Sequence, residues 1–101
     1  MTNSQKVYQA GNTIRLECTF HDFDGQLIDP PLISVRIYDL KYKLLSTTSI
    51  GNLNRTSKGQ YFYDYVSPVQ GGVVWYEWYA EVGGFPSLRR EQLKTSFVGL
   101  F

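Results

Sequence analysis

Hydrophobic and polar residues alternate along most of this chain with a period of two. The clearest segment covers residues 13–20, where the even-numbered positions are Ile14, Leu16, Cys18 and Phe20 and the odd-numbered ones are polar. Successive side chains of a strand point to opposite faces, so this alternation predicts a strand with one buried face. The same pattern predicts further strands at residues 33–38, 44–50, 60–66, 73–82 and 89–98, and a short one at residues 7–9.

Turn-forming residues separate these segments. They are Gly11-Asn12, Asp24-Gly25, Pro30-Pro31, Gly71-Gly72 and Gly83-Gly84. Glycine, asparagine and aspartate favour tight turns, and proline excludes a helix interior. Polar connections are expected at residues 39–43 and 51–59, an edge strand at 44–50, and a short helix is the alternative for residues 87–93. We therefore predict one all-β domain over residues 1–101, an antiparallel immunoglobulin-like β-sandwich of about seven strands.

The longest predicted strand, residues 73–82, carries aromatic side chains on both faces. Its uncharged face consists of Val74, Tyr76, Trp78, Ala80 and Val82. The other face includes two glutamates, so we expect it to be solvent-exposed together with Trp75 and Tyr79. Phe62 of a neighbouring strand is expected beside these two rings. Such a patch is typical of an interaction surface, although loops or cross-strand stacking could also cover the rings.

Composition and charge narrow the possible partners. Aromatic residues make up 16% of the chain, and ten basic and nine acidic residues leave a formal net charge of +1. A nucleic-acid partner is disfavoured because there is no strongly basic field. A membrane partner is not expected either, because no apolar stretch approaches spanning length. Residues 1–6 do not resemble a signal peptide, so the protein is expected to be made in a cytoplasm.

The residues that could carry chemistry are few. Cys18 is the single cysteine and is expected to be a small buried apolar residue. His21 lies three positions later, which would place it on the opposite strand face from Cys18. Asp22 and Asp24 are interpreted as turn formers and not as metal ligands. We expect no catalytic residue, cofactor or metal site, and no enzymatic activity.

Two further segments could contribute to an interface. Arg89 and Arg90, with Lys94, form a small basic cluster, and the C-terminal residues from Phe97 to Phe101 are apolar. Residues 1–12 and 96–101 are therefore possible docking ends. The full set of interface candidates is Phe62, Trp75, Tyr79, Arg89, Arg90, Phe97, Leu100 and Phe101.

A family resemblance follows from the order of these motifs. They are Tyr8-Gln9-Ala10-Gly11-Asn12-Thr13-Ile14, the Asp-Gly turn within residues 23–30, Val35-Arg36-Ile37-Tyr38-Asp39, Gly59-Gln60-Tyr61-Phe62-Tyr63, and the closing segment 90–98. This layout resembles small immunoglobulin-like proteins of tailed-phage and prophage structural modules. It is also similar to the β-sandwich repeats of macroglobulins.

The resemblance implies a virion component made in the host cytoplasm. Its role would be in neck or head–tail joining, head decoration or a tail accessory, without enzymatic activity. The implied partners are portal, capsid or tail proteins and further copies of the chain. The alternative is a module that binds carbohydrate or a cell surface, in which Trp75 and Tyr79 would stack on sugar rings.

Overall fold

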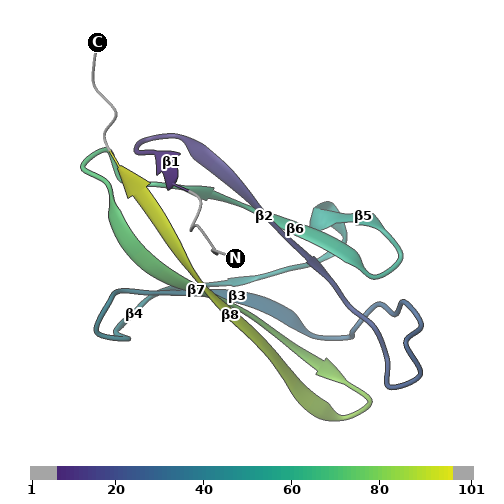
Figure 1. Cartoon of the computed structure of the whole chain (residues 1–101). Helices are drawn as coiled ribbons and strands as arrows, with labels where there is room; N and C mark the ends of the chain where they lie inside the picture. Colours follow the sequence, from purple (N-terminus) through teal and green to yellow (C-terminus); the bar gives the residue numbers. More distant parts are fainter. Residues whose placement is uncertain (1–6, 97–101) are drawn as a thin grey trace, which may run out of the picture.

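The computed structural model describes residues 7–96, which form two β-sheets packed face to face (Figure 1). The five-stranded sheet has the order β1 (Val7–Gln9), β8 (Phe85–Ser96), β7 (Gly72–Val82), β3 (Ile33–Tyr38) and β4 (Leu44–Ser49). The three-stranded sheet has the order β2 (Thr13–Thr19), β6 (Gln60–Val66) and β5 (Arg55–Ser57). All pairs are antiparallel except β1 with β8. The prediction of an all-β chain is confirmed.

The core lies between the two sheets and follows the predicted alternation. Along β2 every second side chain is buried, and β3 shows the same period. Trp78 of β7 is 1% exposed and meets Phe20 edge-to-face, with ring centroids 6.3 Å apart. Phe20 in turn contacts Tyr61 of β6. The predicted inward face of β7 is confirmed, because Trp78, Ala80 and Val82 are all buried.

Two predictions about the elements were wrong. The polar segment 51–59 contains a short 3-10 turn, η1 (Asn52–Asn54), and the edge strand β5, which is exposed on both faces and so shows no alternation. The predicted last strand is confirmed as far as Ser96, and the alternative of a helix over residues 87–93 is excluded because they pair along their whole length with β7. The longest strand is β8, with twelve residues against eleven for β7. Phe97 and Val98, the predicted end of the last strand, lie outside the described residues.

The Asp29 side chain, in the connection between β2 and β3, forms hydrogen bonds that hold this connection against the β5–β6 hairpin. Its carboxylate accepts hydrogen bonds from the Gly59 amide at 2.8 Å and from the Tyr61 hydroxyl at 3.0 Å, and it forms a two-pronged ion pair with Arg55. Gly59 has φ +74°, and a Cβ there would lie 2.9 Å from the Phe20 carbonyl oxygen, so only glycine fits this turn. Arg55, with help from the Gly59 and Tyr61 donors, lowers the pKa of Asp29 to about 2.

This lowered pKa predicts a specific loss of stability in acid. The pKa of Asp29 is about 2 in the folded chain against an ordinary value of 3.8. The ionised carboxylate therefore stabilises the fold above about pH 4, and this contribution disappears as the pH falls towards 2. We expect Asp29→Asn to be less stable than the parent at pH 6 and the two urea-unfolding curves to converge near pH 2. A constant difference between the two proteins across this range would contradict the assignment.

Candidate interaction surface

The outer face of the five-stranded sheet brings charged and aromatic residues from three strands into one row. Cross-strand pairing places Glu77 of β7 between Arg36 of β3 and Arg90 of β8. The pairs on either side place Trp75 opposite Tyr38, and Tyr79 opposite Ser34. Paired residues of neighbouring strands share a face, so all these side chains lie on the side of the sheet away from the core.

Glu77 is the centre of this face and is buried although it points away from the core. It is 1% exposed. One carboxylate oxygen accepts hydrogen bonds from Arg36 at 3.2 Å and from the Tyr38 hydroxyl at 3.3 Å. The other oxygen accepts two from Arg90, whose pKa is raised mainly by this bond. The sequence correctly predicted the direction of Glu77 but not its burial, which arises because two arginines from separate strands fold over it.

Aromatic rings surround this charged centre. Tyr42, in the turn between β3 and β4, stacks on Trp75 with ring centroids 5.5 Å apart and an interplanar angle of 22°. The Arg90 guanidinium lies 5.7 Å from the ring centroids of both Tyr38 and Tyr42. Arg36 lies 4.6 Å from the ring of Tyr79, which also donates a hydrogen bond to Glu81. We call this surface the aromatic–arginine face; it comprises Arg36, Tyr38, Tyr42, Trp75, Glu77, Tyr79 and Arg90.

Tyr42 reaches Trp75 from an uncommon backbone conformation. Its φ of 63° makes it the one non-glycine residue with positive φ among residues 7–96. The left-handed region costs roughly 1–2 kcal/mol for a residue with a Cβ. The turn is held by Asp39, whose backbone and side chain bond the amides of Lys41, Tyr42 and Lys43. The hydrogen bonds to Asp39 therefore offset the cost of the conformation that places the Tyr42 ring against Trp75.

The structure unites only some of the predicted interface residues. Trp75, Tyr79 and Arg90 belong to the aromatic–arginine face. Phe62 does not lie beside them, because β6 belongs to the other sheet, where the Arg15 guanidinium lies 3.8 Å from the centroid of its ring. Arg89 also lies elsewhere.

Arg89 and Arg90 are neighbours in sequence but point to opposite faces of β8. Arg90 bonds Glu77, whereas Arg89 forms an ion pair with Glu91 at 2.8 Å. The period of a strand therefore splits the expected basic cluster. The remaining candidates Phe97, Leu100 and Phe101 lie outside the described residues.

Sequence reasoning missed Arg36, Tyr38 and Tyr42. The alternation of residues 33–38 already places Arg36 and Tyr38 on the outward face of their strand. Adding the expected pairing of that strand with residues 73–82 would have identified both. Tyr42 gives no such signal, because its position depends on the geometry of the Asp39 turn.

A small cavity lies at the open side of the sandwich, between the ends of β2 and β8. Its volume is about 120 Å³, and it is lined by Cys18, Thr19, Phe20, His21, Trp78, Ser87 and Arg89. Burial raises the pKa of Cys18 to about 11, so its thiol stays protonated at neutral pH and is a poor nucleophile. Cys18 and His21 line the same cavity, contrary to their predicted separation, because the chain leaves the regular strand before His21.

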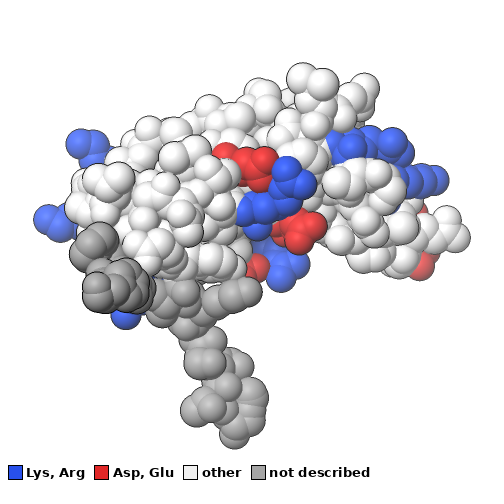
Figure 2. Space-filling model, turned by 90° about the horizontal axis from the view of Figure 1, so that it is seen from above, with Lys and Arg blue, Asp and Glu red and all other residues white. Residues whose placement is uncertain are grey.

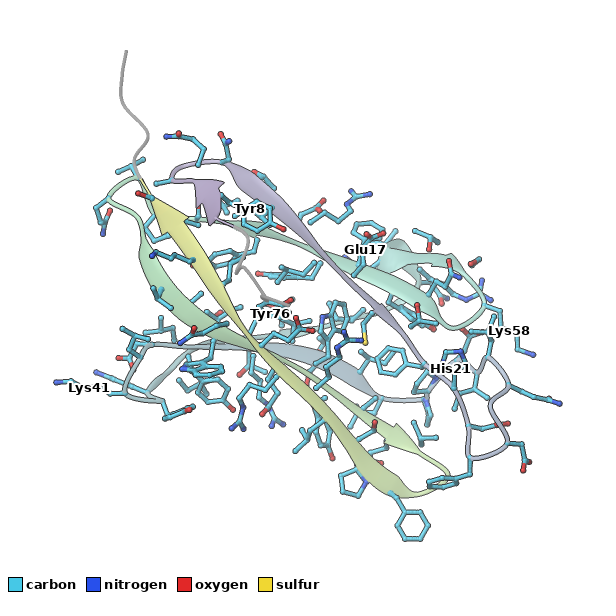
Figure 3. The ribbon with its side chains drawn as sticks, viewed as in Figure 1. Tyr8, Glu17, His21, Lys41, Lys58 and Tyr76 are labelled. Atoms are coloured by element: carbon cyan, nitrogen blue, oxygen red, sulfur yellow. The ribbon has the colours of Figure 1, made fainter. Side chains whose placement is uncertain are left out.

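Side chains outside the aromatic–arginine face lie both between the two sheets and at the ends of the molecule. Tyr8 and Tyr76 point into the space between the sheets, whereas Lys41 and Lys58 project at opposite ends of the molecule (Figure 3). Figure 2 shows a face on which acidic and basic side chains lie next to one another in its middle, so no broad field of one sign forms there. Within residues 7–96, no three His, Cys, Asp or Glu residues are grouped as metal ligands.

Comparison of the chain with known protein families, with curated protein sequences and with solved structures finds no significant match. In the part of the chain that the structure describes, no helix is long and apolar enough to cross a membrane.

The burial of Glu77 predicts a large effect of removing its carboxylate. We expect Glu77→Ala to lower the free energy of unfolding by about 2 kcal/mol, because hydrogen bonds to a charged group are lost at a buried position. Glu17→Ala is the matched control: Glu17 is an exposed mid-strand glutamate of the other sheet, and its removal should change stability by less than about 0.5 kcal/mol. Urea unfolding of the three proteins measures both values, and equal losses would show that Glu77 has no special role.

Proposed function

We propose that this chain is a non-enzymatic binding domain whose aromatic–arginine face docks on another protein. The observation that carries the proposal is the arrangement of Trp75, Tyr42 and the two arginines around the buried Glu77 carboxylate. Trp, Tyr and Arg dominate the energetics of protein interfaces. Their rotamers here are already fixed by mutual contacts, so little side-chain freedom remains to be lost on binding.

We further propose that the sandwich is of immunoglobulin-like type. The order β5-β6-β2 in one sheet and β8-β7-β3 in the other is supporting evidence. If these six strands are taken in sequence as B to G, the sheets read D-E-B and G-F-C, which is the arrangement of an immunoglobulin domain. On this scheme β4 is an additional strand beside C, and β1 pairs with G.

The proposed setting is the particle of a tailed bacteriophage, with portal, capsid or tail proteins as partners. The setting rests on the resemblance of the sequence motifs to small immunoglobulin-like phage proteins. A near-neutral net charge and a prebuilt aromatic face suit a part that is held by its protein neighbours and not by nucleic acid. The role would be in neck or head–tail joining, head decoration or a tail accessory.

Carbohydrate or cell-surface binding is the second candidate, because half-buried Trp75 and Tyr79 rings share one face. The contacts of these rings favour a protein partner. Tyr42 stacks on Trp75, and Arg36 lies against Tyr79, so each ring already has a neighbour where a sugar would stack. Binding on a glycan array that is lost in Trp75→Ala would favour this candidate.

Site-specific crosslinking tests the docking face. A photo-crosslinking phenylalanine analogue would be placed at position 79 and, as a matched control, at the exposed position 17 of the other sheet. Particles would be purified from cells producing the virus that encodes the chain, and then irradiated. We expect the chain to co-purify with the particles and to crosslink to another particle protein from position 79 only.

This experiment tests the virion setting and the docking face separately. Absence of the chain from the particles would rule out the virion setting. Crosslinks from position 17 and none from position 79 would show that the wrong face was chosen. Once the crosslinked partner is identified, its affinity for the Trp75→Ala variant can be measured. We expect it to be about thirtyfold weaker than for the parent, the usual effect of truncating an aromatic anchor.

A further inference from the structure

The outer strand β4 leaves backbone hydrogen-bonding groups without a partner strand. The amide of Ile50 donates to the carbonyl of Ile33, which fixes the phase of the antiparallel β3–β4 ladder. Hydrogen-bonded and non-bonded pairs alternate in such a ladder. Ser49 and Thr47 are in the non-bonded pairs with Ser34 and Arg36, so their N–H and C=O groups point away from β3. Among residues 7–96 no strand lies on that side.

From Ser46 to Ser49 this edge lacks the devices that usually prevent strand addition; a register shift at Leu45 interrupts only the start of the ladder. Leu44–Ser49 contains no charged residue, no proline and no glycine. Leu44 is 50% exposed and Leu45 is 54% exposed, which adds apolar area along an open edge. Charged side chains, prolines, bulges and very short strands normally protect such edges.

The other sheet edges described here are protected in these ways, including residues 85–93 of β8, which β1 leaves unpaired and which contain a proline and three charged residues. β1 and β5 are each three residues long, and β5 begins with Arg55. β2 carries the exposed charges of Arg15 and Glu17. β4 therefore stands out as the edge most open to an additional strand.

We propose that β4 pairs antiparallel with β4 of a second copy of this chain. In the register that sets Thr47 against Ser49 of the other copy, the outward groups of these two residues supply four main-chain hydrogen bonds. The pairing is two-fold symmetric, so the same surface serves both copies and the assembly closes as a dimer. It joins the two five-stranded sheets into one continuous sheet.

Charge allows a second copy as the occupant and favours the antiparallel orientation. Lys41 and Lys43 lie in the turn at one end of β4, and Lys41 projects from the molecule there (Figure 3). Antiparallel pairing puts the lysine turns of the two copies at opposite ends of the new ladder, whereas parallel pairing would place like charges side by side. The strand itself is neutral, and the net charge of +1 gives little long-range repulsion between copies.

The pairing leaves the aromatic–arginine face uncovered and enlarges it. β4 lies next to β3 in the same sheet, so the two faces of a dimer would lie side by side on one surface. A partner with repeated subunits could then be bound at two points. The inference goes beyond the proposed docking face and does not depend on it, since edge pairing uses backbone groups of β4 alone.

Light scattering over a concentration series tests the proposal with variants at one position. The parent should shift from one to two copies as the concentration rises. Thr47→Pro removes an outward N–H that is not used within the domain, and it should weaken dimerisation by about thirtyfold, one lost hydrogen bond in each copy. Thr47→Val keeps that N–H and a β-branched side chain, and should dimerise as the parent does.

A second variant keeps the test decisive if the proline disturbs folding. Thr47→Lys retains the backbone groups but introduces a charge of the kind that protects natural edges, and it should weaken dimerisation as well. Urea unfolding would confirm that each variant is folded. A parent that remains monomeric at all concentrations would overturn the proposal. So would an oligomer, dimeric or larger, that persists unchanged in both Thr47→Pro and Thr47→Lys.

Discussion

The packing of Trp78 between the two sheets is the contact on which the other features depend. Its ring meets Phe20 edge-to-face and so links the central strand of one sheet to the end of β2 in the other. Truncating a core tryptophan to alanine commonly costs about 3–5 kcal/mol, a large part of the stability of a small domain. With Trp78 directed inward, the strand period directs Trp75, Glu77 and Tyr79 outward. The core thus determines which residues form the aromatic–arginine face.

The fold was most predictable where each strand has one buried and one exposed face. β2 and β3 alternate almost without exception, and both were placed correctly from the pattern. β5 and the first half of β8 are exposed on both faces, so no alternation marks them. The hairpin of β7 and β8 extends away from the second sheet in Figure 1, which explains why residues 85–90 lack an apolar face.

The site was less predictable because it depends on which strands are neighbours. The outward direction of Trp75 and Tyr79 followed from their own strand. The burial of Glu77 required arginines from β3 and β8, and the exclusion of Phe62 required the assignment of β6 to the other sheet. These are contacts between residues far apart in sequence, which a local period of two does not encode. Pairing the predicted strands before choosing site residues would have recovered part of them.

The face and the edge of the five-stranded sheet offer two different kinds of recognition. The face presents side chains, so its specificity depends on the identities of Trp75, Tyr42 and the arginines. The edge presents the backbone groups of Thr47 and Ser49, which any extended neutral strand could satisfy. Specificity at the edge must then come from what flanks it, the lysine turn at one end and the exposed leucines beside it.

The turn at Asp39 connects these two surfaces physically. Through its hydrogen bonds it holds Tyr42 at positive φ, which delivers the tyrosine ring to Trp75 on the face. The same turn carries Lys41 and Lys43 and leads directly into β4. The Asp39 turn therefore determines both the position of one aromatic ring on the face and the charge beside the start of the edge strand.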